Sequence, residues 1–162
     1  MKSVGILFPG QGAQAIGMGR WLCETHPAAN SLFNQASEIL GYDLGELCAE
    51  GPESQLNETV YSQPALFVVG MAAATVMREQ FPDRLAAVKA AAGLSLGEYT
   101  AVCFAGGLDF ADGLRLVQRR GQAMQAAADA VQSGMPSVLG LDLNAVKQVC
   151  DDCRHEGEVL QP

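Results

Sequence analysis

The chain has 162 residues, of which 49% are hydrophobic, and a formal net charge of −8 at pH 7. This length provides one sizeable hydrophobic core and the beginning of a second, smaller one. The acidic balance disfavours binding to nucleic acid phosphates or to anionic lipid, so we expect neither nucleic acid nor a membrane as a partner. We also expect no bilayer-spanning apolar run and no secretory signal, and therefore a cytoplasmic protein.

The pattern of apolar residues predicts strands and helices in alternation over residues 1–130. In chain order we expect a strand over 4–8, two short helices within 19–40, a helix over 43–49, a loop over 51–59, a long core helix over 61–81, a strand over 88–92, and helices over 96–104 and 109–129. Each strand runs into a glycine-rich loop, PGQGAQ after the first and GLSLG after the second.

The pattern changes near 130–135, where we place a subdomain boundary. Beyond it we expect a strand over 135–142, a helix over 144–157 closed by glycine, and the start of a strand over 158–162. These elements would begin a small β-α-β unit. Residues 1–130 are therefore assigned to one subdomain and 131–162 to a second, incomplete one.

The chain has five cysteines, an odd number: Cys23, Cys48, Cys103, Cys150 and Cys153. Most of them lie in segments with a helical pattern, which indicates reduced thiols and not a disulfide framework. Cys150, Cys153 and His155 lie close together in sequence, but a structural zinc site needs four ligands and no second cysteine pair has matching spacing. We therefore expect no metal site.

The stretch GLSLGEYTA, residues 93–101, places a serine between two glycines where a strand meets a helix. The glycines permit a sharp turn that exposes the hydroxyl of Ser95 and aims the backbone N–H of Leu96 at the space above it. The start of the helix favours a developing oxyanion there. By itself the pattern is equally typical of a simple turn, since the chain has 18 glycines.

The loop FPGQGAQ, residues 8–14, is expected beside that turn, because loops that follow parallel strands emerge at the same carboxyl edge of a sheet. The N–H of Gln11 is then a candidate second donor to an oxyanion. The loop lacks the third glycine of a dinucleotide fingerprint and the lysine of a phosphate-binding loop. Nucleotide binding is therefore not expected.

Four blocks occur along the chain: GQGAQ at 10–14, SQPALF at 62–67, GLSLGEYTA at 93–101 and QRRGQAMQ at 118–125. In order and interval they resemble the malonyl-CoA:acyl carrier protein transacylases, including the acyltransferase domains of polyketide synthases. The resemblance implies an α/β fold: a hydrolase-like large subdomain with a parallel sheet, and the start of a small ferredoxin-like subdomain. It also implies a transfer of malonyl from malonyl-CoA, through a seryl ester, to the pantetheine thiol of acyl carrier protein, in fatty acid or polyketide biosynthesis.

The resemblance assigns roles to five residues. Ser95 would be the nucleophile, and the backbone N–H groups of Gln11 and Leu96 the oxyanion hole. Arg120 matches the family's substrate arginine, whose guanidinium offers two parallel N–H bonds to the free carboxylate of malonate. Gln63 matches a glutamine that lines the same cleft. No cofactor is implied, because coenzyme A enters as the substrate thioester, and the complete protein is expected to be a monomer.

Two departures from the family pattern affect the predicted mechanism. Leu94 stands where the family often has a histidine before the nucleophile. Family members are also about twice as long, and their catalytic histidine lies in the half that this chain does not cover. The two histidines present, His26 and His155, match no family position. We therefore interpret the chain as the N-terminal part of a transacylase that is inactive alone.

Two alternatives stay open at this point. A serine hydrolase or thioesterase would use the same turn, although Arg120 and the GQGAQ block are not needed for hydrolysis. A non-catalytic fragment that binds acyl-CoA would fit the lack of a base. The sequence leaves open the choice between malonyl and methylmalonyl. Carrier proteins are typically acidic, so a basic patch is expected, with Arg115, Arg119 and Arg154 as candidates.

Overall fold

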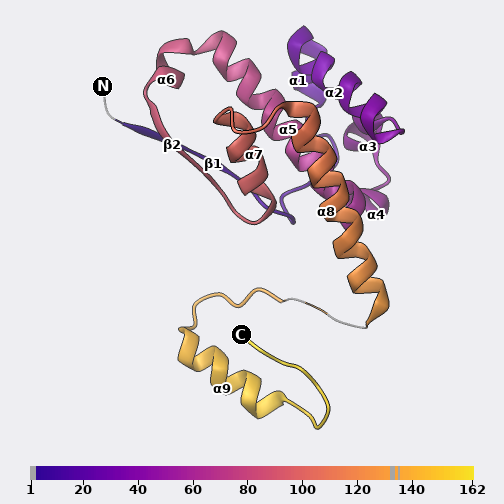
Figure 1. Ribbon diagram of the computed structural model, residues 1–162, viewed down its shortest axis with the longest axis vertical. Coiled ribbons are helices and arrows are strands. Elements are labelled where there is room, and N and C mark those ends of the chain that lie inside the picture. Colours follow the sequence, from indigo (N-terminus) through magenta and orange to yellow (C-terminus); the bar gives the residue numbers. More distant parts are fainter. Residues whose placement is uncertain (1–2, 132–133, 135) are drawn as a thin grey trace. The chain divides into compact units, whose positions relative to one another are not determined.

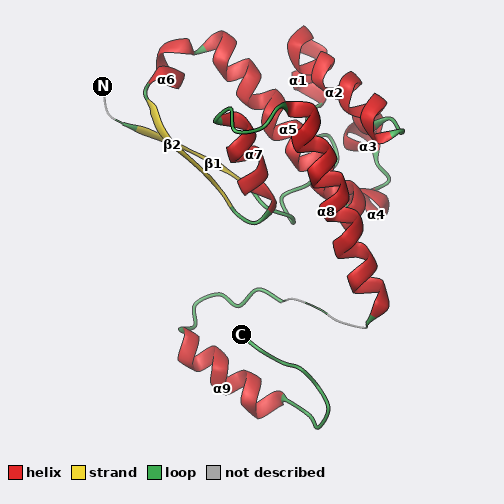
Figure 2. Ribbon diagram, viewed as in Figure 1, coloured by secondary structure: helices red, strands yellow, loops and turns green. Residues whose placement is uncertain are grey.

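A computed structural model describes residues 3–131, 134 and 136–162. The chain divides into two compact units, Met1–Ala130 and Val131–Pro162, and each is described by itself. The elements of the first unit are β1 (Val4–Phe8), α1 (Arg20–Thr25), α2 (Pro27–Leu40), α3 (Leu44–Glu50), α4 (Glu53–Leu56), α5 (Thr59–Gln80), α6 (Pro82–Ala86), β2 (Val88–Gly93), α7 (Leu96–Phe104) and α8 (Phe110–Ala130) (Figures 1 and 2). The second unit contains α9 (Leu143–Cys153).

The strands β1 and β2 lie side by side and run in parallel (Figure 2). Val4 pairs with Val88 and Phe8 with Gly93, so both strands end at the same level. The N–H of Leu94 donates to the carbonyl of Phe8 at 3.2 Å, which extends the pairing into the loops. The prediction of an α/β fold with a parallel sheet is therefore confirmed, and the two glycine-rich loops leave the sheet at one edge.

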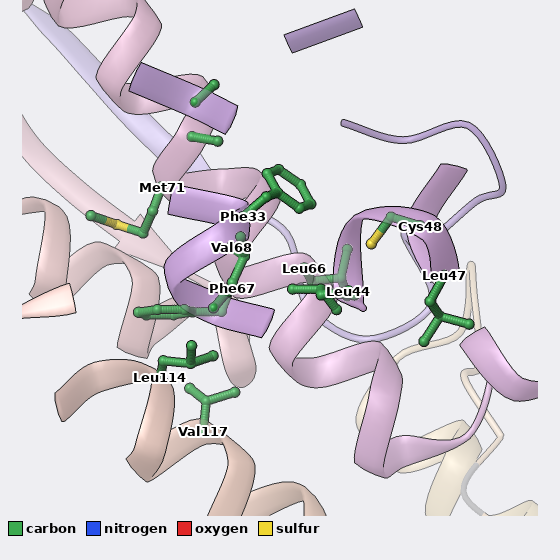
Figure 3. Packing of buried hydrophobic residues seen from close by; sticks show 14 of the residues in the cluster. Phe33, Leu44, Leu47, Cys48, Leu66, Phe67, Val68, Met71, Leu114 and Val117 are labelled. Atoms are coloured by element: carbon green, nitrogen blue, oxygen red, sulfur yellow. The ribbon is translucent and has the colours of Figure 1, made fainter. Parts of the chain in front are cut away.

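The core of the first unit is built around α5, which contacts α2, α7 and α8. Phe67 of α5 is fully buried and stacks on Phe110 with ring centroids 5.7 Å apart. Figure 3 shows Phe67 lying close to Leu114 and Val117, both on α8. A Cβ on Gly113 would lie 2.8 Å from the Phe67 ring, so the glycine allows α8 to approach α5 closely.

The helix α5 also has the length and hydropathy expected of a membrane span, and it is the one helix among the described residues that has both. The expectation that no apolar run reaches this length was wrong. However, 61% of the relevant window is buried inside the protein. A buried core helix passes the same test, so the finding is weak evidence for a span.

Two short helices were not predicted. α4 forms inside the segment expected to be a loop, and α6 begins at Pro82, whose fixed φ suits the first position of a helix. Helices of four or five residues contain too few apolar positions to show a helical period. Their sequences therefore resemble loops.

In the second unit the predicted helix is confirmed, but the predicted strands are not. The side chain of Asp142 caps α9 by accepting the N–H of Ala145 at 2.9 Å. Residues 136–142 and 158–162 form no strand, and residue 135 of the first predicted strand lies outside the described residues. A strand needs a neighbour for its hydrogen bonds, and within the described part of this unit neither segment has one.

The cysteines are free thiols, and Cys48, Cys103 and Cys150 are buried. Burial raises the pKa of the Cys48 thiol to about 12 and also raises the pKa values of Cys23 and Cys103. These three thiols are therefore protonated at neutral pH. Across the described ranges, no three or more His, Cys, Asp or Glu side chains are grouped so as to hold a metal ion.

Candidate active site

Ser95 occupies a sharp turn between β2 and α7. It has φ 52° and ψ −102°, and it is the one non-glycine residue among those described with a positive φ. Such a conformation is costly for a residue with a side chain and persists only where the surroundings enforce it. The N–H of Gly97 closes the turn by donating to the carbonyl of Leu94 at 2.9 Å. The exposed hydroxyl therefore lies at the start of α7.

The glycines around Ser95 are required by backbone contacts. A Cβ on Gly93 would lie 1.9 Å from the carbonyl carbon of Gly97, and a Cβ on Gly97 would lie 2.2 Å from the carbonyl oxygen of Phe8. In the neighbouring loop, a Cβ on Gly10 would lie 2.7 Å from the carbonyl oxygen of Leu94. The glycines of the Gly-x-Ser-x-Gly pattern are thus required because two strand ends and a helix approach closely here. A solvent-exposed turn alone would not require them.

Arg120 reaches Ser95 from α8. Its Nη2 donates to Ser95 Oγ at 2.8 Å, and its Nη1 donates to Gln63 Oε1 at 2.7 Å. The next residue, Gly121, allows this approach, because a Cβ there would lie 3.0 Å from the carbonyl oxygen of Thr59 at the start of α5. The structure therefore brings together three of the residues that the sequence singled out: Ser95 from the turn before α7, Gln63 from α5 and Arg120 from α8.

Gln63 links this cluster to the loop after β1. It is fully buried, and its Nε2 donates to Gln11 Oε1 at 3.3 Å while its Oε1 accepts from Arg120. Gln11 Nε2 donates in turn to Thr59 Oγ1 at 3.1 Å. A buried amide is costly unless its polar atoms are bonded. This chain of hydrogen bonds therefore fixes the orientation of both glutamines and the position of Arg120 Nη1.

Sequence reasoning missed Tyr99 and Thr59. The Cζ of Arg120 lies 5.5 Å from the centroid of the Tyr99 ring. Tyr99 is four residues after Ser95, and the helix predicted over 96–104 would begin immediately after the serine, so Tyr99 was expected one turn into that helix. That spacing was an available signal. Thr59 had none, because its contact with Gln11 depends on how the loop meets α5.

Residues 6–155 match the family model of the acyl transferase domain. The chain belongs to this family. The human mitochondrial malonyl-CoA-acyl carrier protein transacylase is 45% identical over 155 residues, which are 96% of this chain and 40% of that protein. The resemblance deduced from the four blocks is therefore confirmed.

Solved structures agree with this assignment. An acyl-carrier-protein-S-malonyltransferase from Bartonella henselae is 41% identical with a TM-score of 0.82, covering 94% of this chain and 48% of that one. A second match, 38% identical with a TM-score of 0.81, belongs to a complex of a holo type II polyketide synthase acyl-carrier protein with its malonyl-transacylase, and covers 93% of this chain and 48% of that one. The chain spans about half the length, or less, of these relatives.

The two predicted oxyanion donors of this acyl transferase domain lie where their loops meet. Leu96 opens α7, so its N–H belongs to the first turn, which a helix leaves without internal acceptors. Gln11 follows Gly10, where a Cβ would lie 2.7 Å from the carbonyl oxygen of Leu94, and the Gln11 side chain is tied to Thr59 of α5. Leu94 itself is 73% exposed beside the serine. An apolar surface therefore stands where the family often has histidine.

The hydroxyl of Ser95 has an arginine as its partner and no histidine among the described residues. His26 lies between α1 and α2, packs on Trp21, and has its Nε2 3.4 Å from Gln80 Nε2. Gln80 ends α5, about 25 Å along the helix from Gln63. His155 lies in the second unit, where its backbone N–H donates to Glu158 Oε2 at 3.2 Å. His26 is therefore not placed to act on Ser95.

Proposed function

We propose that the protein containing this chain transfers a malonyl group from malonyl-CoA, through an ester on Ser95, to the pantetheine thiol of an acyl carrier protein. The observation that carries the proposal is the placement of Arg120, whose guanidinium donates to both Ser95 Oγ and Gln63 Oε1. The printed names of the relatives, which refer to malonyl groups and acyl carrier protein, support it.

The arrangement suits an acyl group that carries a free carboxylate. In malonyl thioesters the carboxylate carbon is separated from the reacting carbonyl carbon by one methylene group. A cation adjacent to the nucleophile can therefore bind the carboxylate while Ser95 attacks the carbonyl. A guanidinium has five N–H donors, and Arg120 uses two of them here, which leaves donors for a bidentate carboxylate. An acetyl group offers no such partner.

The proposed reaction has two steps. Ser95 Oγ forms a bond to the thioester carbonyl carbon while its proton passes to a base, and the carbon–sulfur bond breaks to release coenzyme A. The pantetheine thiol then gives its proton to the base and attacks the ester carbonyl carbon, the bond between that carbon and Ser95 Oγ breaks, and Ser95 Oγ regains a proton from the base. In both steps the negative charge on the carbonyl oxygen would be stabilised by the N–H groups of Gln11 and Leu96. The start of α7 favours the same charge.

Arg120 cannot be the base, because a guanidinium does not lose its proton in proteins. We propose that the base comes from the portion of the protein that corresponds to the remaining half of its relatives. We also propose that residues 1–130 are the N-terminal part of a hydrolase-like large subdomain, and that 131–162 begin a ferredoxin-like small subdomain. The complete protein is proposed to be a monomer without metal or other cofactor.

Three arginines were candidates for a basic contact with the acidic carrier protein, and two of them are paired with a carboxylate of this chain. Arg115 pairs with Asp112 at 3.0 Å, and Arg154 pairs with Asp151 at 2.9 Å. We propose the exposed Arg119, beside Arg120 on α8, as the contact. The absence of nucleic acid and membrane partners stays a prediction, as does the cytoplasmic location, since two relatives are named as mitochondrial.

The test of this function is covalent loading of the full-length protein by malonyl-CoA, measured by intact mass. The wild type is expected to form a malonyl ester, and Ser95→Ala is expected to form none while keeping its circular dichroism spectrum, because the exposed hydroxyl contributes little packing. An ester on the Ser95→Ala variant would contradict the assignment. Release of free malonate without carrier protein would favour a hydrolase, and a wild type that binds acyl-CoA without an ester would favour a non-catalytic binding protein.

A further inference from the structure

The ring of Tyr99 contacts the guanidinium of Arg120, the group that the proposed function assigns to the substrate carboxylate. The Arg120 Cζ lies 5.5 Å from the ring centroid, which is within the distance of a cation–π interaction. Tyr99 is half-buried and packs against the hydrophobic core with the rest of its ring. The ring is therefore a fixed surface, which a mobile exposed side chain would not provide.

A long arginine side chain needs more than one contact to hold its plane. The hydrogen bonds to Gln63 and Ser95 hold Nη1 and Nη2, but Ser95 Oγ is the reacting atom, and the bond to Gln63 alone would permit rotation of the guanidinium. A ring that faces the cation removes this freedom, because the attraction is strongest over the face of the aromatic ring. Gln63 and Tyr99 together therefore define both the position and the tilt of the guanidinium.

The two supports come from different elements. Gln63 belongs to α5, whereas Tyr99 belongs to α7, the helix that begins immediately after Ser95. Tyr99 lies in the first turns of α7 and Ser95 is the residue that precedes this helix, so the ring of Tyr99 is held on the element that directly follows the serine. The guanidinium is thereby held in register with the nucleophile itself.

We propose that Tyr99 is a positioning residue that holds the Arg120 guanidinium beside Ser95, and so contributes to selecting acyl groups with a free carboxylate. This inference rests on the proposed transfer of malonyl. It assigns to the tyrosine of the GLSLGEYTA block a role that packing alone would not require. The hydroxyl of Tyr99 has no part in it, so a phenyl ring should serve equally well.

The test compares variants of the full-length protein in transfer from malonyl-CoA and from acetyl-CoA. Tyr99→Phe keeps the ring and is expected to stay within about twofold of wild type for both donors. Tyr99→Leu and Tyr99→Met fill much of the volume without a ring, and are expected to lower kcat/KM for malonyl-CoA by roughly 3- to 30-fold. Acetyl transfer should change by less than about twofold, since acetyl makes no bond to Arg120.

A series of ring-fluorinated phenylalanines at position 99 separates electrostatics from packing. Fluorination withdraws electron density from the ring face at nearly constant volume, so malonyl transfer should fall stepwise with the number of fluorines. These proteins keep the core contacts of Tyr99→Phe, which makes the test informative even where the aliphatic variants fail to fold. A flat response across the series would overturn the cation–π role.

The remaining outcomes separate this inference from the function on which it rests. A wild type without preference for malonyl over acetyl would contradict the proposed function itself. A wild type with that preference, combined with equal losses for both donors in Tyr99→Leu and Tyr99→Met, would leave the function standing and reduce Tyr99 to a structural residue.

Discussion

At the scale of single residues, Arg120 is where the proposed specificity is most directly testable. Arg120→Ala removes the donors to Ser95 Oγ and Gln63 Oε1 and the proposed partner of the carboxylate. A charge-assisted pair contributes about 1.5–3 kcal/mol, so malonyl transfer should fall by roughly one to two orders of magnitude. Acetyl transfer should hold or rise. Rates with both donors, measured in the full-length protein, check this expectation.

The matched control is Arg20→Ala, which removes an exposed arginine at the start of α1 that pairs with Glu50 at the end of α3. It should leave both rates near those of wild type, because surface ion pairs contribute little. If Arg120→Ala slows malonyl and acetyl transfer equally, the arginine supports the fold and does not select the substrate.

The sequence predicted the members of this cluster but not its connections. Ser95, Arg120, Gln63 and Gln11 were recognisable because each lies in a block with a family pattern, and the structure brings their side chains together. Their catalytic roles stay predictions. The contact of Tyr99 with Arg120 depends on how α7 packs against α8. The periodicity of apolar residues predicts that each helix forms, but not which side chains of two packed helices touch.

At the scale of elements, the turn between β2 and α7 predicts a sharp dependence on glycine. In Gly97→Ala the new Cβ would lie 2.2 Å from the Phe8 carbonyl oxygen, so the ends of β1 and α7 must separate. Overpacking against backbone costs about 1–3 kcal/mol or more. We expect a lower free energy of unfolding, measured by chemical denaturation of the full-length protein, and slower acylation of Ser95.

Gly5→Ala is the control for this change, since a Cβ there meets its nearest atom at 3.9 Å, an ordinary contact, within the same pair of strands. It should alter the free energy of unfolding by less than about 1 kcal/mol. Equal destabilisation by both variants would mean that the close approach of Gly97 to the Phe8 carbonyl is not the cause of the loss in Gly97→Ala.

Helices and strands were predicted more accurately where the pattern of apolar residues extends over a longer segment. α8 repeats an apolar face over several turns and α5 is apolar over most of its length, and both were predicted within a few residues of their observed ends. α4 and α6 are shorter than two turns and carry no such repeat. The two strands predicted in the second unit were apolar enough, but strand formation depends on a partner that the sequence of the segment does not contain.

At the scale of the whole molecule, the sheet of the first unit leaves backbone hydrogen-bonding groups unpaired and apolar side chains exposed. Within the described residues it has two strands, so both outer edges carry unpaired backbone groups. Leu7 of β1 is 80% exposed and Val4 is 41% exposed. A groove of about 330 Å³ between β1 and α5 is lined by apolar side chains, among them Phe8, Leu66 and Met77. Such surface is normally covered in a stable protein.

We therefore expect residues 1–162, expressed alone, to be marginally stable and to load malonyl far more slowly than the full-length protein. The exposed sheet favours self-association, and Ser95 has Arg120 as its partner where a base would be needed to make it nucleophilic. Some residual acylation is expected from the preformed turn, because triad hydrolases keep part of their rate enhancement without the triad.

The measurement is malonyl loading by intact mass for residues 1–162 alone, for the same chain mixed with the separately produced remainder of the protein, and for the full-length protein. Recovery on mixing would show that the remainder covers the sheet and supplies the base. Loading by residues 1–162 alone at the rate of the full-length protein would contradict this account, and His26→Ala and His155→Ala would then identify the base within the chain.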